Sequence, residues 1–213
     1  MPLLAKETTT KDYEPIEQGV HHAICCWVID LGHQYNEKWG NDQHKAVIAW
    51  ELPHLRIDIE NEDGSIENKP KVISRIFTLS LGTKSHLRPF LESWRGKRFG
   101  FEELMGFDIS KLIGVNCQLN VVHNNVGEKT YANVATAMPL LKGTEHKNPE
   151  NETIFYSIED HGLLMPEIAP EWIKNILMQS KEWNETGQQN DEWRPPAYDD
   201  EPPLPDDDEP IPF

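Results

Sequence analysis

Cysteine is scarce in this sequence, and long apolar runs are missing from it. Only three of the 213 residues are cysteines, and two of them, Cys25 and Cys26, are adjacent. Adjacent cysteines rarely form a disulfide with each other. An odd number of cysteines without the spacing of a disulfide framework is typical of a protein in a reducing cytoplasm. No stretch approaches the roughly 18 apolar residues of a membrane span, and residues 1–17 lack the apolar core of a signal peptide. We therefore expect a soluble cytoplasmic protein that does not contact a membrane.

Motifs for catalysis are missing as well. The sequence contains neither a phosphate-binding Gly-Lys-Ser/Thr loop nor a Gly-x-Ser-x-Gly nucleophile elbow. The pairs His21-His22 and Cys25-Cys26 could suggest a metal site. On one strand, however, the two members of each pair point to opposite faces, and no second pair has zinc-finger spacing. We expect no enzymatic activity, no cofactor and no bound metal.

Basic residues are few overall but unevenly placed. The chain has 20 Lys and Arg against 36 Asp and Glu, a formal net charge of −16. Residues 184–213 hold ten acids and one Arg, a net −9. Residues 69–100 hold eight bases and a single acid, Glu92, a net +7. A cationic segment therefore lies in the middle of an acidic chain.

The cationic segment is interleaved with aromatic residues. A single-strand binder needs this combination, because cations contact the phosphates and flat rings stack on any base. Phe90, Leu91 and Trp94 recur at helical spacing and are predicted to be core. The candidate nucleic-acid-binding residues are Trp39, Trp50, Lys69, Lys71, Arg75, Phe77, Lys84, Arg88, Arg95, Lys97, Arg98 and Phe99. Of these, Arg95, Lys97 and Arg98 flank Gly96 in a predicted loop and are the strongest candidates for phosphate contacts.

The hydrophobic pattern predicts a mainly β fold. Alternating apolar residues predict strands at 19–31, 45–52, 72–81, 115–123 and 129–140, and helical spacing predicts a helix from about Ser85 to Gly96. Three strands, a helical connection and two strands is the order expected of a five-stranded Greek-key barrel of the oligonucleotide-binding (OB) type. An open α+β sheet with the same order is the alternative.

The composition divides the chain into four parts. Residues 1–18 are predicted to form a flexible arm, and residues 19–142 the OB-type single-stranded DNA-binding domain. Residues 143–183 are predicted to form a linker, a short strand near 154–158 and an amphipathic helix that starts at Pro170. Residues 184–213 are rich in Pro, Gln, Asp and Glu and are predicted to be disordered.

The last eight residues combine acids with an apolar hook. Four carboxylates precede two prolines and a terminal ring, so the segment can offer a ring and a carboxylate to a pocket on a basic partner. It resembles the acidic C-terminal tip of bacterial single-stranded DNA-binding proteins, although Glu209-Pro210 lengthens the spacing. The resemblance implies a partner-binding tip made of Asp206, Asp207, Asp208, Glu209, Ile211, Pro212 and Phe213.

A second resemblance covers roughly residues 20–142. The phrases at 93–97, 106–108 and 112–114 are similar to those of small bacteriophage replication-region proteins of presumed DNA-binding function. Together the two resemblances imply a phage or prophage protein of the bacterial host cytoplasm. It would coat single-stranded DNA during replication and recombination and recruit replication, recombination or repair enzymes through its tip.

Two alternatives and one question stay open. The chain could be an acidic DNA mimic that inhibits a host nuclease or restriction enzyme. It could also be a metal-dependent nuclease whose carboxylates are Asp30, Glu51 and Asp58. The pattern does not decide whether the protein forms a homo-oligomer.

Overall fold

A computed structural model describes residues 14–61, 63–127, 129–165 and 167–187. The fold is mainly β, an antiparallel sheet to which one short parallel strand is added. The strands are β1 (Gly19–Asn36), β2 (Asn41–Glu60), β3 (Ile66–Thr78), β4 (Asn116–Val126), β5 (Lys129–Pro139) and β6 (Ile154–Tyr156). The helices are α1 (Leu87–Arg95), α2 (Phe101–Met105), a 3-10 turn (Ile109–Leu112), α3 (Ile158–His161), α4 (Glu171–Met178) and α5 (Lys181–Gly187).

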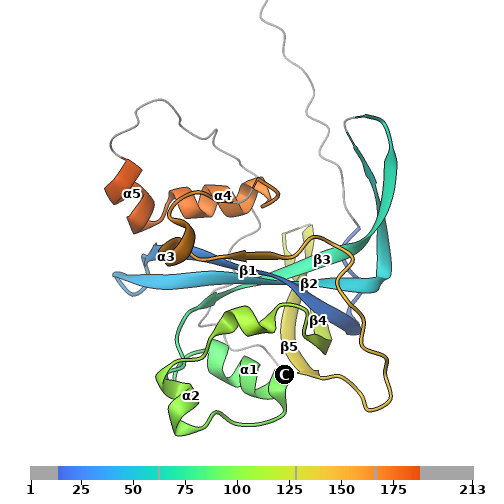
Figure 1. The fold of residues 1–213 in the computed structure, drawn as a ribbon, viewed down its shortest axis with the longest axis horizontal. Helices are drawn as coiled ribbons and strands as arrows, with labels where there is room; N and C mark the ends of the chain where they lie inside the picture. Colours follow the sequence, from blue (N-terminus) through green and yellow to red (C-terminus); the bar gives the residue numbers. More distant parts are fainter. Residues whose placement is uncertain (1–13, 62, 128, 166, 188–213) are drawn as a thin grey trace, which may run out of the picture.

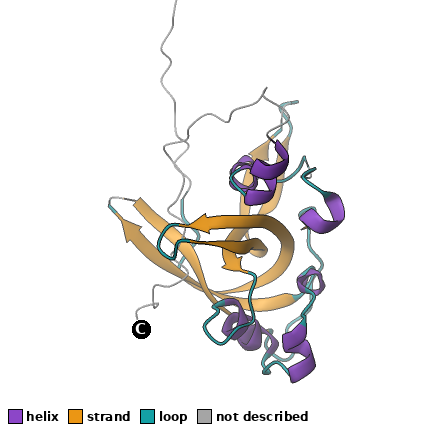
Figure 2. Ribbon diagram, turned by 90° about the vertical axis from the view of Figure 1, so that its left-hand side faces the viewer, coloured by secondary structure: helices purple, strands orange, loops and turns teal. Residues whose placement is uncertain are grey.

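The strand order is β3-β2-β1-β4-β5, and β6 pairs in parallel with β1. The strand β1 makes this order possible because its first half pairs with β4 and its second half with β2. Register shifts between Cys25 and Trp27 and between Asp30 and His33 mark bulges, which bend a strand and increase its twist. The sheet curls strongly as a result (Figure 2).

The inner face of the curled sheet packs against α1. The helix buries Leu87, Phe90, Leu91 and Trp94, which share one face at helical spacing. This confirms the prediction that Phe90 and Trp94 are core residues. The helices α1 and α2 lie on one side of the sheet, and α3, α4 and α5 lie on the other (Figure 1).

The outer face carries a second core. Ile29 and Leu31 of β1, Val47 of β2 and Ile76 of β3 pack with β6 and α4. From α4 this cluster takes Ile173, Ile176 and Leu177. A strand near 154–158 and a helix beginning after Pro170 agree with the sequence pattern. The predicted single helix to 183 is instead two, because Ser180 Oγ accepts a hydrogen bond from Trp183 N and starts α5.

The sheet does not close by backbone pairing between β3 and β5. Arg75 of β3 spans the gap, and its Nη1 donates to the carbonyls of Val134 (3.0 Å) and Ala135 (3.1 Å) on β5. The guanidinium also lies over the rings of Phe77 (4.8 Å) and Phe90 (5.7 Å). A side chain therefore joins the two edge strands.

The structure describes only part of the predicted N-terminal arm and of the predicted C-terminal tail. Within the predicted arm, residues 14–18 are described, and the ring of His123 lies 2.8 Å from the carbonyl of Ile16. The tail predicted to be disordered begins at residue 184, but residues 184–187 belong to α5, and the rest of the predicted tail lies outside the described residues. In the part of the chain that the structure describes, none of the helices has the length and apolar character needed to cross a bilayer.

Candidate nucleic-acid interface

Three of the predicted stacking rings are inside the molecule. Trp50 and Phe77 are completely buried, and Phe99 is 7% exposed. Trp50 packs between Phe90 (5.7 Å) and Trp94 (5.6 Å). The prediction that these three rings stack on bases is wrong, because none offers a free face. Trp39, in the turn between β1 and β2, keeps the predicted exposure at 58%.

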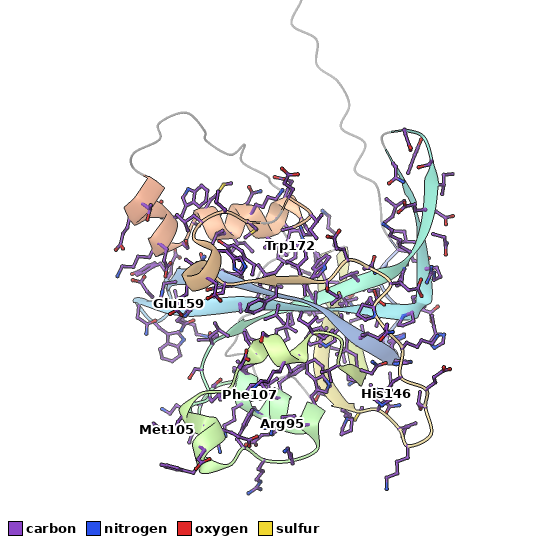
Figure 3. The ribbon with its side chains drawn as sticks, viewed as in Figure 1. Arg95, Met105, Phe107, His146, Glu159 and Trp172 are labelled. Carbon is purple, nitrogen blue, oxygen red and sulfur yellow. The ribbon has the colours of Figure 1, made fainter. Side chains whose placement is uncertain are left out.

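Two of the predicted phosphate ligands also point inward. Arg75 closes the gap between β3 and β5, as described above. Arg95 forms an ion pair with Glu103 and lies over the rings of Phe99 (4.4 Å) and Phe107 (5.3 Å). In Figure 3 the labelled Arg95 and Phe107 lie close together on the side of the sheet that carries α1 and α2. Both guanidinium groups are engaged inside the protein, although Arg95 Nη1 is buried without a hydrogen-bond partner among the described residues. The prediction that Arg75 and Arg95 contact phosphates is therefore corrected to a structural role.

The other predicted cations remain accessible to different degrees. Arg88 pairs with Glu92 at 3.1 Å and Lys69 with Glu67 at 2.5 Å, both near the surface, where such pairs are weak and open to competition by phosphate. Lys71 is half-buried. Lys84, Lys97 and Arg98 are exposed, and none of the three forms an ion pair with another described residue.

The loop between α1 and α2 is held rigidly from within. Gly96 adopts the left-handed conformation (φ 67°) that ends α1, and Lys97 N donates to the carbonyl of Glu92 (3.2 Å). The Glu92 side chain accepts from Phe99 N (3.1 Å), and this bond is the main reason that the pKa of Glu92 lies below its ordinary value. Glu103 similarly accepts from Gly100 N (2.9 Å).

Two exposed apolar side chains next to this loop were not predicted. Phe101 is 82% exposed and Met105 is 78% exposed, and they share one face of α2 at i, i+4 spacing. In Figure 3, Met105 lies at the edge of the molecule, away from the sheet. The signal in the sequence was a five-residue helix with apolar residues at both ends. A helix of this length buries little apolar surface, and none of its residues is buried here.

Residues of the segment 147–187 cover the outer face of the sheet mainly over β1, and they reach β2 at Val47 and Glu51 and β3 at Ile76. Glu51 is completely buried, and its carboxylate accepts from Glu150 N (2.9 Å), Asn151 N (2.8 Å) and Asn151 Nδ2 (2.9 Å). The carboxylate therefore anchors the segment that follows β5. Next to it, α4 packs on Val47 and Ile76.

The three carboxylates of the nuclease alternative do not act together. Glu51 is the anchor just described, and Asp58 accepts from Asn68 Nδ2 (2.6 Å) on the adjacent strand. Asp30 belongs to a separate cluster with His44. Among the described residues, no group of three or more His, Cys, Asp and Glu is arranged to hold a metal ion.

A histidine–carboxylate cluster joins α5 to the sheet. His44 Nε2 lies 2.7 Å from Asp30 Oδ1, and the ring of His44 stacks on that of His33 at 4.6 Å. His33 in turn bonds Glu182 of α5 through both its ring and its backbone N–H. The α5 helix approaches β1 closely at Gly32, where the Cβ atom of a larger residue would lie 2.6 Å from Glu182 Oε2.

The cluster shifts the pKa values of its members. The hydrogen bond to Asp30 raises the pKa of His44, and burial opposes it. Burial acts to raise the pKa of Asp30, but hydrogen bonds from His44, Gly32 and Ile158 outweigh it and lower that pKa. The pKa of Glu182 is lowered by the same balance, burial being outweighed by the bonds from His33.

These shifts predict how stability depends on pH. Protonated His44 stabilises the folded state. This contribution to the free energy of unfolding is complete below the ordinary histidine pKa of about 6.5 and is lost as the pH rises through the higher pKa of the folded protein. The contribution of Asp30 and Glu182 is complete above about pH 4.5 and is lost on acidification. We expect the free energy of unfolding in urea to fall as the pH rises above about 6.5.

The H44N variant should lose this alkaline decline, and H146N, at an exposed linker position, should keep it. A decline of equal size in H44N would exclude His44 as its source.

The cysteines are buried and unreactive in this arrangement. Cys25, Cys26 and Cys117 are all free thiols with no exposed surface. Burial raises the pKa of Cys26 to about 12 and also raises that of Cys25 and Cys117. The thiols therefore stay protonated near neutral pH and serve as core side chains.

The predicted partner-binding tip, residues 206–213, lies outside the described residues. No protein-family model matches the chain, and no curated protein matches it either.

Proposed function

We propose that this chain is a non-catalytic single-stranded DNA-binding protein built on an OB-type Greek-key barrel. The observation that carries the proposal is the strand order β3-β2-β1-β4-β5, with α1 placed in the connection between β3 and β4 and packed under the curled sheet. This is the order expected of an OB fold, whose members bind oligonucleotides. Arg75 joins β3 to β5 where such a barrel would close.

The chemistry available on the surface supports this function. Lys84, Lys97 and Arg98 are exposed cations, and Arg88 could exchange its surface partner for a phosphate. Trp39 and Phe101 are exposed rings on which bases could stack regardless of sequence. We further propose that the tip at 206–213 recruits replication, recombination or repair proteins, as its resemblance implies, in a phage-infected or prophage-carrying host.

Titration with oligo-dT tests the proposal directly. We expect oligo-dT to bind at low salt, and the logarithm of the association constant to fall with the logarithm of salt concentration by about 0.7 per phosphate contacted. Duplex DNA of the same length should bind more weakly, because paired bases cannot stack on protein rings. Fluorescence anisotropy of labelled oligonucleotides measures both. Absence of oligo-dT binding at low salt would contradict the proposal.

A second candidate is supported by one observation. Residues 143–187, which supply the cover of the outer face, hold nine acids and three bases, a net −6. A DNA mimic carries acids on its folded body in this way. It would bind a nuclease or restriction enzyme and would not bind DNA at any salt concentration, so the same titration separates the two candidates.

A further inference from the structure

The face that OB folds use for nucleic acid is partly covered in this protein. OB folds bind oligonucleotides on the face formed by strands 2 and 3. Here Val47 and Ile76 of that face belong to the apolar cluster that also contains α4, and Glu51 anchors the segment at Glu150 and Asn151. The covering segment is also acidic, at −6 over residues 143–187, and would repel phosphates.

The opposite side of the sheet carries a net positive charge and exposed side chains, which a binding site for single-stranded DNA needs. Residues 84–111, which include α1 and α2, hold six bases and four acids, a net +2. Three ion pairs cancel within this segment, Arg88–Glu92, Arg95–Glu103 and Lys111–Asp108. The net charge therefore comes from Lys84, Lys97 and Arg98 against Glu102. Lys97 and Arg98 are exposed and form no ion pair within the described ranges.

An exposed ring stands beside these two cations. Phe101 begins α2 three residues after Arg98 and is 82% exposed, with Met105 one turn further along. Phe99, between them, is buried against Phe107 at 5.2 Å and anchors the loop. Since Glu92 and Glu103 also bind backbone N–H groups of this loop, the backbone that carries the two cations and the ring is held in one conformation.

We propose that single-stranded DNA crosses the corner between α1 and α2, with Lys97 and Arg98 on phosphates and Phe101 stacked on a base. The inference rests on the proposed function and locates its site on the helical side of the sheet, away from the partly covered strand face. Met105 extends the apolar surface next to the stacked base.

Charge reversal tests the cationic part of the site. The double variant K97E/R98E should bind oligo-dT at least about tenfold more weakly, and its salt slope should be smaller by about 1.4 because two phosphate contacts are lost. The control K142E/K147E makes the same charge change at two exposed linker positions and should stay within about twofold of the wild type at 0.15 M salt, where distant charges are screened.

Truncation of the ring tests the stacking part. F101A should weaken oligo-dT binding about tenfold, within the range for one stacked base, and should leave the salt slope unchanged. The control L164A removes an 84% exposed side chain from the covering segment and should bind as the wild type does. Circular dichroism and urea midpoints confirm that each variant is folded, as expected for exposed positions.

The outcomes are distinguishable. If the wild type fails to bind oligo-dT, the proposed function and this inference both fall. If the wild type binds oligo-dT, and K97E/R98E and F101A bind it no more weakly than their control variants, only the location of the site is overturned.

Discussion

Replacing Arg75 by leucine is expected to lower the free energy of unfolding by about 3 kcal/mol. The variant would leave the carbonyls of Val134 and Ala135 without their charged donor, and hydrogen bonds to charged groups contribute about 1.5–3 kcal/mol each. It would also remove a cation from the faces of Phe77 and Phe90, worth about 0.5–1 kcal/mol or more. Urea denaturation followed by circular dichroism measures the change.

Two further variants make the result specific to the gap between β3 and β5. R75K keeps the charge but not the reach of the guanidinium, so its stability should lie between those of the wild type and R75L. R98L removes an exposed arginine and should change stability by no more than about 0.5 kcal/mol. Equal losses in R75L and R98L would show that Arg75 has no special part in joining the two strands.

Replacing Glu51 by alanine is expected to cost about 3 kcal/mol as well. The Glu51 carboxylate has no exposed surface and accepts three hydrogen bonds from Glu150 and Asn151. The variant therefore leaves the backbone N–H groups of Glu150 and Asn151 without their acceptor, whereas Asn151 Nδ2 keeps the carbonyl of Pro70. Thermal and urea denaturation measure the loss. Hydrogen exchange at the amides of Glu150 and Asn151 should accelerate more than exchange in β4, because the covering segment loosens first.

The matched controls separate this anchor from a general loss of charge. E51Q keeps one acceptor oxygen and should lose about 1 kcal/mol, while E152A removes an exposed carboxylate and should change stability by no more than about 0.5 kcal/mol. If E51A is as stable as E152A, the buried carboxylate does not hold the segment in place.

Much of the local structure could be read from the pattern of apolar residues. Helical spacing located α1 and identified Phe90 and Trp94 as core, and alternation located the five long strands in their correct order. The sheet is not closed into the expected barrel, since β3 and β5 are joined by the Arg75 side chain instead of a backbone ladder, and the described sheet is open, as in the alternative. The strands are longer than predicted because polar hairpin arms such as residues 56–60 of β2 still pair across to β3.

The burial of the aromatic and cationic residues could not be predicted from the sequence. Alternation correctly separates the two faces of β2, with Ile48 and Trp50 together, but it does not say which face is inside. Trp50 and Phe77 therefore became candidates although both are buried. Arg75 and Arg95 became candidates because their partners are not evident from the chain: Val134 and Ala135 are 59 and 60 residues from Arg75.

Sequence alone determined the order of elements, the helix α1, the apolar stripe of α4 and the uneven distribution of charge, because each depends on residues close together in the chain. Only the tertiary structure decided which cations form no ion pair, which rings stay exposed and which part of the sheet's outer face is covered from the segment 147–187. Those outcomes depend on contacts between distant segments, such as Glu51 with Asn151 and His33 with Glu182, which become defined when the sheet curls.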